Sequence, residues 1–231
     1  MPYKRVIAIG DSFTRGDELT GCPGEIPNKP FQHSQSTWPA LIAESLNCDY
    51  ECYAIGGSGN HWISWQAAAT LKQDALFIIN WSWFERFDYV DVDTETDDWA
   101  VTHPRHEGKL DHYFYRNLDS DIWNLHRNLQ QMHSTISLLK QNNIDFIMTC
   151  LDTHYSLTYN VSGYGTWVNA ISSLQKQVLP HIVDFEDMSF LEWSKHKGFE
   201  LGPNGHPLEK AHIEAAKYIN TVITKESQNE H

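Results

Sequence analysis

The alternation of short apolar runs with stretches of helical periodicity is the strongest constraint on the fold. Residues 5–10, 49–55, 75–81, 144–151 and 181–185 are predicted to be strands. Each run is short and apolar, as expected for strands that are covered on both faces. Helical patterns separate them, and this order is typical of βαβ units. The sequence therefore predicts an α/β protein with three layers, α/β/α, around a parallel sheet of about five strands.

The predicted helices lie between these strands. The block Ser36-Thr37-Trp38-Pro39 opens a helix through Leu46, and Pro39 suits its first turn. Further helices are predicted over 61–72, 119–141, 167–178 and 208–223. Residues 84–118 hold many acids and aromatics without clear periodicity, which predicts an inserted loop or lid. At 231 residues, the chain is predicted to be a single domain over 1–231 with this one insertion.

Composition excludes several classes of function. The net charge of −13 argues against binding to nucleic acid or anionic membranes, because both require a basic face. The N-terminal apolar run is too short for a signal peptide or a membrane span. The four cysteines lack a zinc-binding spacing and are expected to be reduced thiols. We expect a cytoplasmic protein, although a protein released by lysis or a phage component would have the same features.

No motif indicates a metal or a cofactor. The histidines at 103, 106 and 112 match no known ligand spacing. The chain has no phosphate-binding G-x-x-x-x-G-K-[ST] motif, and the glycines at 56, 57 and 59 miss the dinucleotide spacing. We therefore expect neither.

A serine and a histidine at opposite ends of the chain could form a nucleophile and its base. The first strand runs into Gly10-Asp11-Ser12, and Gly205-His206-Pro207 precedes the last helix. A hydroxyl is a weak nucleophile until a neighbouring base takes its proton. The alternative is that Ser12 is only a turn residue. The nearest match to a G-x-S-x-G elbow, at 56–60, has an asparagine in place of the final glycine, so Ser58 is the weaker candidate.

Together these blocks resemble the SGNH hydrolases, also called the GDSL esterase/lipase family. That family carries its nucleophile in a G-D-S block, matched by residues 10–12, and often a Trp-Pro at the next helix, matched by 38–39. Its oxyanion glycine is matched by Gly57, and its late His-Pro by His206-Pro207. The matches between residues 6 and 224 stand in the family's order. The resemblance implies a flavodoxin-like fold, a Ser12–His206 esterase without a cofactor, and Gly57 as a backbone oxyanion donor.

The chain departs from the family in its third block. The family's G-x-N-D supplies an asparagine to the oxyanion hole, whereas this chain has Asn80-Trp81-Ser82-Trp83. Asn80 is the only asparagine there and could instead end the strand. Ser82 is a substitute donor, and Arg86 could face an anionic group of the substrate.

The second departure concerns the acid of the triad. Pro203 occupies the position three residues before His206, where the family has aspartate. Asn204 is the candidate orienting residue, although a backbone carbonyl within 201–204 could also hold the imidazole. A displaced carboxylate is the third alternative, with Asp184, Asp187 and Glu200 as candidates in the sequence.

The predicted function is a serine esterase with a Ser–His dyad or an atypical triad. The oxyanion would be held by the N–H groups of Ser12 and Gly57 and by a side chain of Asn80 or Ser82. Aromatic residues after the second and third strands predict an aromatic pocket rim of Trp62, Trp65, Trp81, Trp83 and Phe84. The residues assigned to the substrate rim are Trp62, Trp81, Trp83 and Arg86. This rim favours a small-molecule or glycan ester, such as O-acetylated carbohydrate. The alternatives are an acyltransferase that uses the same serine, and a catalytically decayed carbohydrate-binding module. The sequence gives no oligomeric state.

Overall fold

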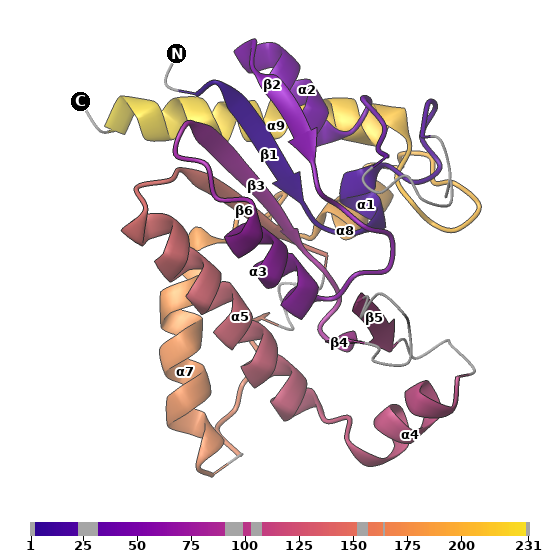
Figure 1. Cartoon of the computed structure of the whole chain (residues 1–231), viewed down its shortest axis with the longest axis vertical. Helices are drawn as coiled ribbons and strands as arrows, with labels where there is room; N and C mark the ends of the chain where they lie inside the picture. Colours follow the sequence, from indigo (N-terminus) through magenta and orange to yellow (C-terminus); the bar gives the residue numbers. More distant parts are fainter. Residues whose placement is uncertain are drawn as a thin grey trace.

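A four-stranded parallel sheet forms the centre of the structure (Figure 1). The computed structural model describes residues 3–22, 32–90, 99–102, 108–151, 157–163 and 165–229. The strands are β1 (Arg5–Ile9), β2 (Asp49–Cys52), β3 (Ala75–Trp81) and β6 (Phe146–Cys150), in the order β2-β1-β3-β6. All three pairings are parallel. This order places the carboxyl ends of β1, β2 and β3 side by side, where ligands of such sheets bind.

The predicted fifth strand was wrong in extent. Only one parallel bridge, between Met148 and Ile182, extends the described sheet beyond β6. The Val183 N–H donates to the Met148 carbonyl at 2.7 Å, after which the chain leaves the sheet. Phe185 and Met188 close a tight turn whose central residues, Glu186 and Asp187, have φ of 54° and 62°. That left-handed backbone cannot continue a strand.

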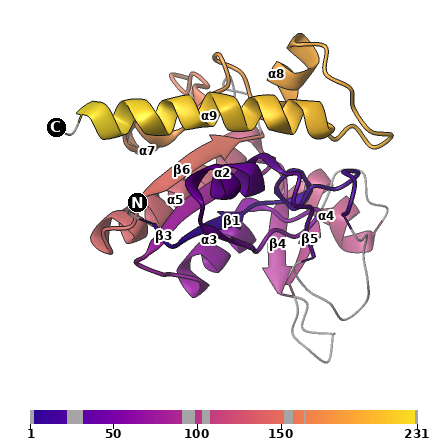
Figure 2. The same cartoon turned by 90° about the horizontal axis from the view of Figure 1, so that it is seen from above.

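Helices cover both faces of the sheet, as Figure 2 shows from above. One face packs against α3 (Asn60–Ala69), α5 (Asp121–Gln141) and α7 (Trp167–Val178). The other packs against α2 (Trp38–Leu46), α8 (Phe190–His196) and α9 (Glu209–Asn229). The predicted three-layer α/β/α architecture is confirmed.

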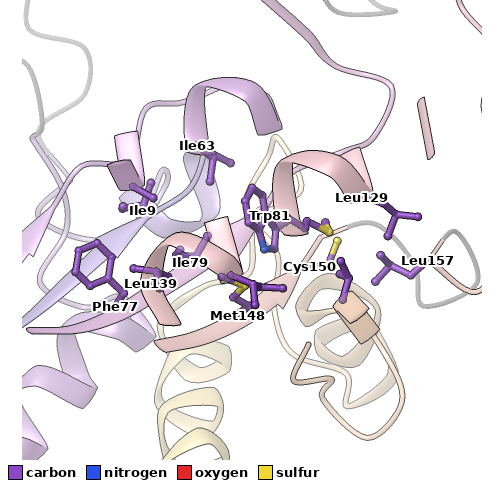
Figure 3. Packing of buried hydrophobic residues seen from close by; sticks show 14 of the residues in the cluster. Ile9, Ile63, Phe77, Ile79, Trp81, Leu129, Leu139, Met148, Cys150 and Leu157 are labelled. Atoms are coloured by element: carbon purple, nitrogen blue, oxygen red, sulfur yellow. The ribbon is translucent and has the colours of Figure 1, made fainter. Parts of the chain in front are cut away.

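Alternation along the strands divides the core into two large apolar clusters, beside a small third one of Ala8, Cys52 and Ala54. Ile7 and Ile9 of β1 point into one, and Val6 points into the other. Figure 3 shows the first cluster, in which Trp81 lies among side chains of the sheet, α3 and α5. Thr37 caps α2 by accepting the Ala40 N–H at 3.4 Å.

The insertion after β3 contains regular structure that the sequence pattern did not indicate. Strands β4 (Phe87–Val90) and β5 (Trp99–Thr102) form an antiparallel pair, and helix α4 (Lys109–Asn117) follows. All three lie at the end of the molecule toward which the sheet strands point (Figure 1). His112 lies on α4, whereas His103 and His106 fall outside the described residues.

In the part of the chain that the structure describes, no helix is both long and apolar enough to cross a membrane.

Candidate active site

Ser12 lies at the carboxyl end of the sheet, on the first turn after β1. It begins a four-residue helix, α1 (Ser12–Arg15), whose N-cap is Asp11. The Asp11 carboxylate accepts the Phe13 N–H at 3.1 Å, and this contact fixes the turn. Ser12 is 7% exposed. The nucleophile candidate is therefore held on a rigid turn directly beyond a buried strand.

His206 contacts Ser12, although 194 residues separate the two in the sequence. Its Nε2 lies 2.9 Å from the Ser12 Oγ, within hydrogen-bond distance. A turn before α9 presents the ring: the Gly202 N–H donates to the His206 carbonyl at 2.8 Å. The Phe13 ring packs against the imidazole with ring centroids 4.9 Å apart. The structure thus brings together the serine and histidine predicted from the sequence.

Glu18 holds the other nitrogen of the imidazole. Its Oε2 lies 2.7 Å from the His206 Nδ1, and the carboxylate side chain is 13% exposed. It also accepts the backbone N–H groups of Asn204 at 2.9 Å and of His206 at 3.3 Å. Burial alone would raise the pKa of Glu18, but these hydrogen bonds outweigh it and the net pKa is lowered. The acid is therefore ionised where it can stabilise an imidazolium.

Local geometry makes room for this carboxylate. A Cβ at position 202 would lie 2.7 Å from the Glu18 carboxyl carbon, so Gly202 permits the close approach. Glu18 itself has a left-handed φ of 70°, a conformation that costs a non-glycine residue energy and is often found at functional sites. Arg15 pairs with the neighbouring Asp17 at 2.5 Å. The Thr20 N–H donates to Glu209 at the start of α9 at 2.7 Å. The Thr20–Glu209 contact links the turn that carries Glu18 to the start of α9, which directly follows the loop that carries His206.

The sequence-based prediction for the orienting group was wrong in its details. Asn204 donates its side-chain amide to Glu18 at 3.2 Å and so contacts the acid. The group on the imidazole is a displaced carboxylate, but it is neither Asp184 nor Asp187 nor Glu200. Glu18 stands 188 residues before His206, so no local spacing indicates it. The one available signal was its place just after Gly16, which ends the short helix α1 and turns the chain back toward the site.

The Gly57 turn lies beside the nucleophile turn. The Ile55 N–H donates to the Gly10 carbonyl at 3.2 Å, and the Ser58 Oγ donates to the same carbonyl at 3.1 Å. Gly57 has φ of 83°, and no atom lies within 4 Å of where its Cβ would be. Among the described residues, neither Ser12 nor Gly57 donates its backbone N–H to another group. Both N–H groups are thus available at this edge of the sheet.

The two predicted side-chain donors have other partners. Asn80 is fully buried in β3, and its Oδ1 accepts the Thr149 hydroxyl at 2.8 Å. Its Nδ2 has no partner among the residues that the structure describes. The Ser82 hydroxyl donates to Asp11 at 3.1 Å and accepts from Arg86 at 2.6 Å. In this arrangement the Ser82 proton is directed to Asp11 and away from an oxyanion.

The predicted aromatic rim was largely wrong. Trp62 and Trp81 are 3% and 0% exposed and belong to the core, where large apolar surfaces are most stabilising. Arg86 is also buried and forms an ion pair with Asp11 at 2.8 Å. Trp83 is half-buried and packs against the opposite cluster. Trp65, which the prediction also placed in the rim, is 49% exposed on α3, and its ring centroid lies 5.7 Å from that of Trp99 of β5.

The described residues contain no group of three or more His, Cys, Asp or Glu side chains that could hold a metal ion. All four cysteines are free thiols. Burial raises the pKa of Cys52 to about 11, so that thiol is not a nucleophile.

Comparison with solved structures places this arrangement among known folds. No protein-family model and no curated protein sequence matches the chain. A carbohydrate esterase family 2 enzyme with a carbohydrate-binding domain from Corynascus thermopiles (Myceliophthora fergusii) is 15% identical, with a TM-score of 0.53 over 97% of this chain and 66% of that one. The psychrotrophic esterase EstA from Pseudoalteromonas sp. is 12% identical, with a TM-score of 0.50 over 97% of this chain and 99% of that one. A lipolytic G-D-S-L family protein from Veillonella parvula is 14% identical, with a TM-score of 0.48 over 95% and 98%.

These likenesses confirm the fold predicted from the sequence blocks: the chain has the SGNH-hydrolase fold. At such low identity the comparison concerns the fold alone. Support for a function therefore has to come from the geometry of the site.

Proposed function

We propose that this protein is a serine esterase with a Ser12–His206–Glu18 triad. The observation that carries the proposal is the chain of two hydrogen bonds, 2.9 Å from serine to imidazole and 2.7 Å from imidazole to carboxylate. A nucleophile, a base and an orienting acid in that order define serine hydrolysis on unrelated folds. A decayed binding module has no need of this arrangement.

The three residues have distinct roles in the reaction. His206 takes the Ser12 proton as the Oγ attacks the ester carbonyl, and later returns it to the leaving alcohol. Glu18 fixes the tautomer by accepting the Nδ1–H and stabilises the imidazolium that forms. Water then enters, loses a proton to His206, and releases the acyl group as the acid while the proton returns to Ser12.

Backbone donors stabilise the negative charge of the tetrahedral intermediate. The N–H groups of Ser12 and Gly57 stand at the same edge of the sheet without described acceptors. Donors held in place before the reaction are worth on the order of 10²–10³ in rate each. Asn80 keeps an unpaired amide nitrogen and is the remaining side-chain candidate.

The proposed substrate class is an O-acylated carbohydrate. Exposed aromatic faces suit the apolar faces of sugar rings, and the Trp65–Trp99 pair offers such a surface. Trp99 also contacts His61 on the first turn of α3, which follows the Gly57 turn. The Corynascus structure with the same fold is a carbohydrate esterase, which agrees with this proposal. Trp65→Ala should raise KM for an acetylated oligosaccharide and leave KM for nitrophenyl acetate unchanged; equal effects on both would exclude the aromatic surface.

Hydrolysis of nitrophenyl acetate by purified variants tests the activity itself. Ser12→Ala and His206→Ala should lower kcat by at least about 10³-fold while the protein stays folded. Ser58→Ala is the matched control, because it removes a hydroxyl from the neighbouring turn and should stay within about tenfold of the wild type. If Ser58→Ala lost hydrolysis and Ser12→Ala kept it, Ser12 would not be the nucleophile.

A further inference from the structure

A buried arginine joins the two turns that carry the proposed oxyanion donors. The Arg86 Nη1 lies 2.8 Å from the Asp11 Oδ2, 2.6 Å from the Ser82 Oγ and 3.0 Å from the Ser58 carbonyl. Asp11 precedes Ser12, and Ser58 follows Gly57. One guanidinium nitrogen therefore contacts the residues next to both donors. Arg86 is 6% exposed and Asp11 is 0% exposed, so water does not screen their attraction.

The loop that carries Arg86 is itself fixed by buried polar contacts. Asn60 accepts the Ser82 N–H at 2.7 Å and donates to the Ser82 carbonyl at 3.1 Å. Arg127 of α5 donates to the Phe84 and Arg86 carbonyls at 3.0 and 2.9 Å. These bonds hold the backbone at 82–86 from both sides, so the guanidinium has a rigid base. A charged side chain on a rigid base can position other groups, whereas one on a mobile loop cannot.

We propose that Arg86 is a positioning residue that holds the nucleophile turn and the Gly57 turn in register, so that the N–H groups of Ser12 and Gly57 converge on one oxyanion. We call this group, Arg86 with Asp11, Ser82 and the Ser58 carbonyl, the Arg86 clamp. This proposal rests on the proposed esterase function. Arg86 positions residues of the site and does not itself contact the substrate.

The clamp predicts a specific kinetic change. Without it, both donors remain present but lose their alignment with the transition state, while the contacts of Glu18 with His206 and Asn204 involve no residue of the clamp. Arg86→Lys keeps a positive charge beside Asp11 but shortens the side chain by one bond, which withdraws the cation from the three groups that Nη1 contacts. It should lower kcat by about 10–100-fold and change KM by less than about threefold, since the lost interaction acts mainly in the transition state. Arg86→Met with Asp11→Asn removes both charges and should lower kcat at least as far.

Hydrogen–deuterium exchange provides a readout that does not depend on activity. In Arg86→Lys, peptides covering 10–16 and 55–59 should exchange at least about threefold faster, and the sheet should be unchanged. Arg5→Met is the matched control, because Arg5 likewise forms ion pairs, with Glu51 and Asp74, but at the opposite end of β1. It should alter neither these peptides nor kcat.

Hydrogen–deuterium exchange and kcat together show which part of the proposal fails. Unchanged exchange at both turns in Arg86→Lys would overturn the clamp, whatever happens to kcat. Faster exchange with an unchanged kcat would overturn its role in oxyanion stabilisation. If the wild type hydrolyses no ester and Ser12 takes no phosphonate label, the esterase proposal fails, and exchange alone then decides whether the clamp holds the two turns together.

Discussion

Glu18→Gln tests the residue that sequence reasoning did not find. The substitution keeps the size of the side chain and removes its negative charge. The carboxylate lies 2.7 Å from the His206 Nδ1 and is largely shielded from water. Loss of the acid from a triad costs about four decades in rate, which corresponds to about 5.5 kcal/mol at about 1.4 kcal/mol per decade. An amide can still orient the ring, so we expect kcat to fall by about 10³–10⁴.

The assay is steady-state hydrolysis of nitrophenyl acetate, with a thermal melt on each variant. Asn204→Ala is the matched control, because it removes a 3.2 Å side-chain contact to the same carboxylate and leaves the 2.9 Å backbone contact intact. It should lose less than about tenfold. A folded Glu18→Gln within tenfold of the wild type would refute the role of Glu18. So would a thousandfold loss in Asn204→Ala, which would restore the amide as the orienting group.

Three further predictions concern the core and the turns around the site. Ser58→Ala should lower the unfolding free energy by about 1–3 kcal/mol in urea titration, because its hydroxyl lies within hydrogen-bond distance of the buried Gly10 carbonyl and of the partly buried Ile55 carbonyl; no loss would contradict these contacts. Burial lowers the pKa of His212 to about 3, so the folded state excludes a proton that the unfolded state binds below about pH 6.5. His212 should thus contribute a fall in the unfolding free energy of about 1.4 kcal/mol per pH unit between pH 6 and 4, and His212→Gln should make the measured slope shallower by about that amount; an equal slope in both proteins would show that His212 is not buried and neutral. Trp81→Ala should cost about 3–5 kcal/mol in stability, whereas a rim residue would change KM and leave stability unaltered.

Local patterns allowed most of the fold to be predicted. Short apolar runs specify strands buried on both faces, and helical spacing specifies the helices that cover them, so four strands and both helical layers were predicted. The fifth strand failed because apolar residues at 181–185 do not reveal the left-handed turn at Glu186 and Asp187. The strands β4 and β5 were missed because their alternation is short and lies among charged residues.

The site was only partly predictable for a different physical reason. Ser12 and His206 belong to short sequence blocks whose spacing reflects local geometry. Glu18 reaches His206 only through the fold, since the turn after α1 packs against the loop before α9. Likewise, tryptophan is common both in cores and at exposed rims, and only burial distinguishes Trp81 from Trp65.

Labelling with a fluorophosphonate, followed by peptide mass spectrometry, tests the central claim most directly. The reagent needs an activated serine and an oxyanion site, and it requires no knowledge of the natural ester. We predict one equivalent of label on the peptide that contains Ser12, none in Ser12→Ala, and labelling slowed by at least about 10²-fold in Glu18→Gln. A label on Ser58, or a wild type that is folded yet takes no label, would contradict the Ser12–His206–Glu18 triad.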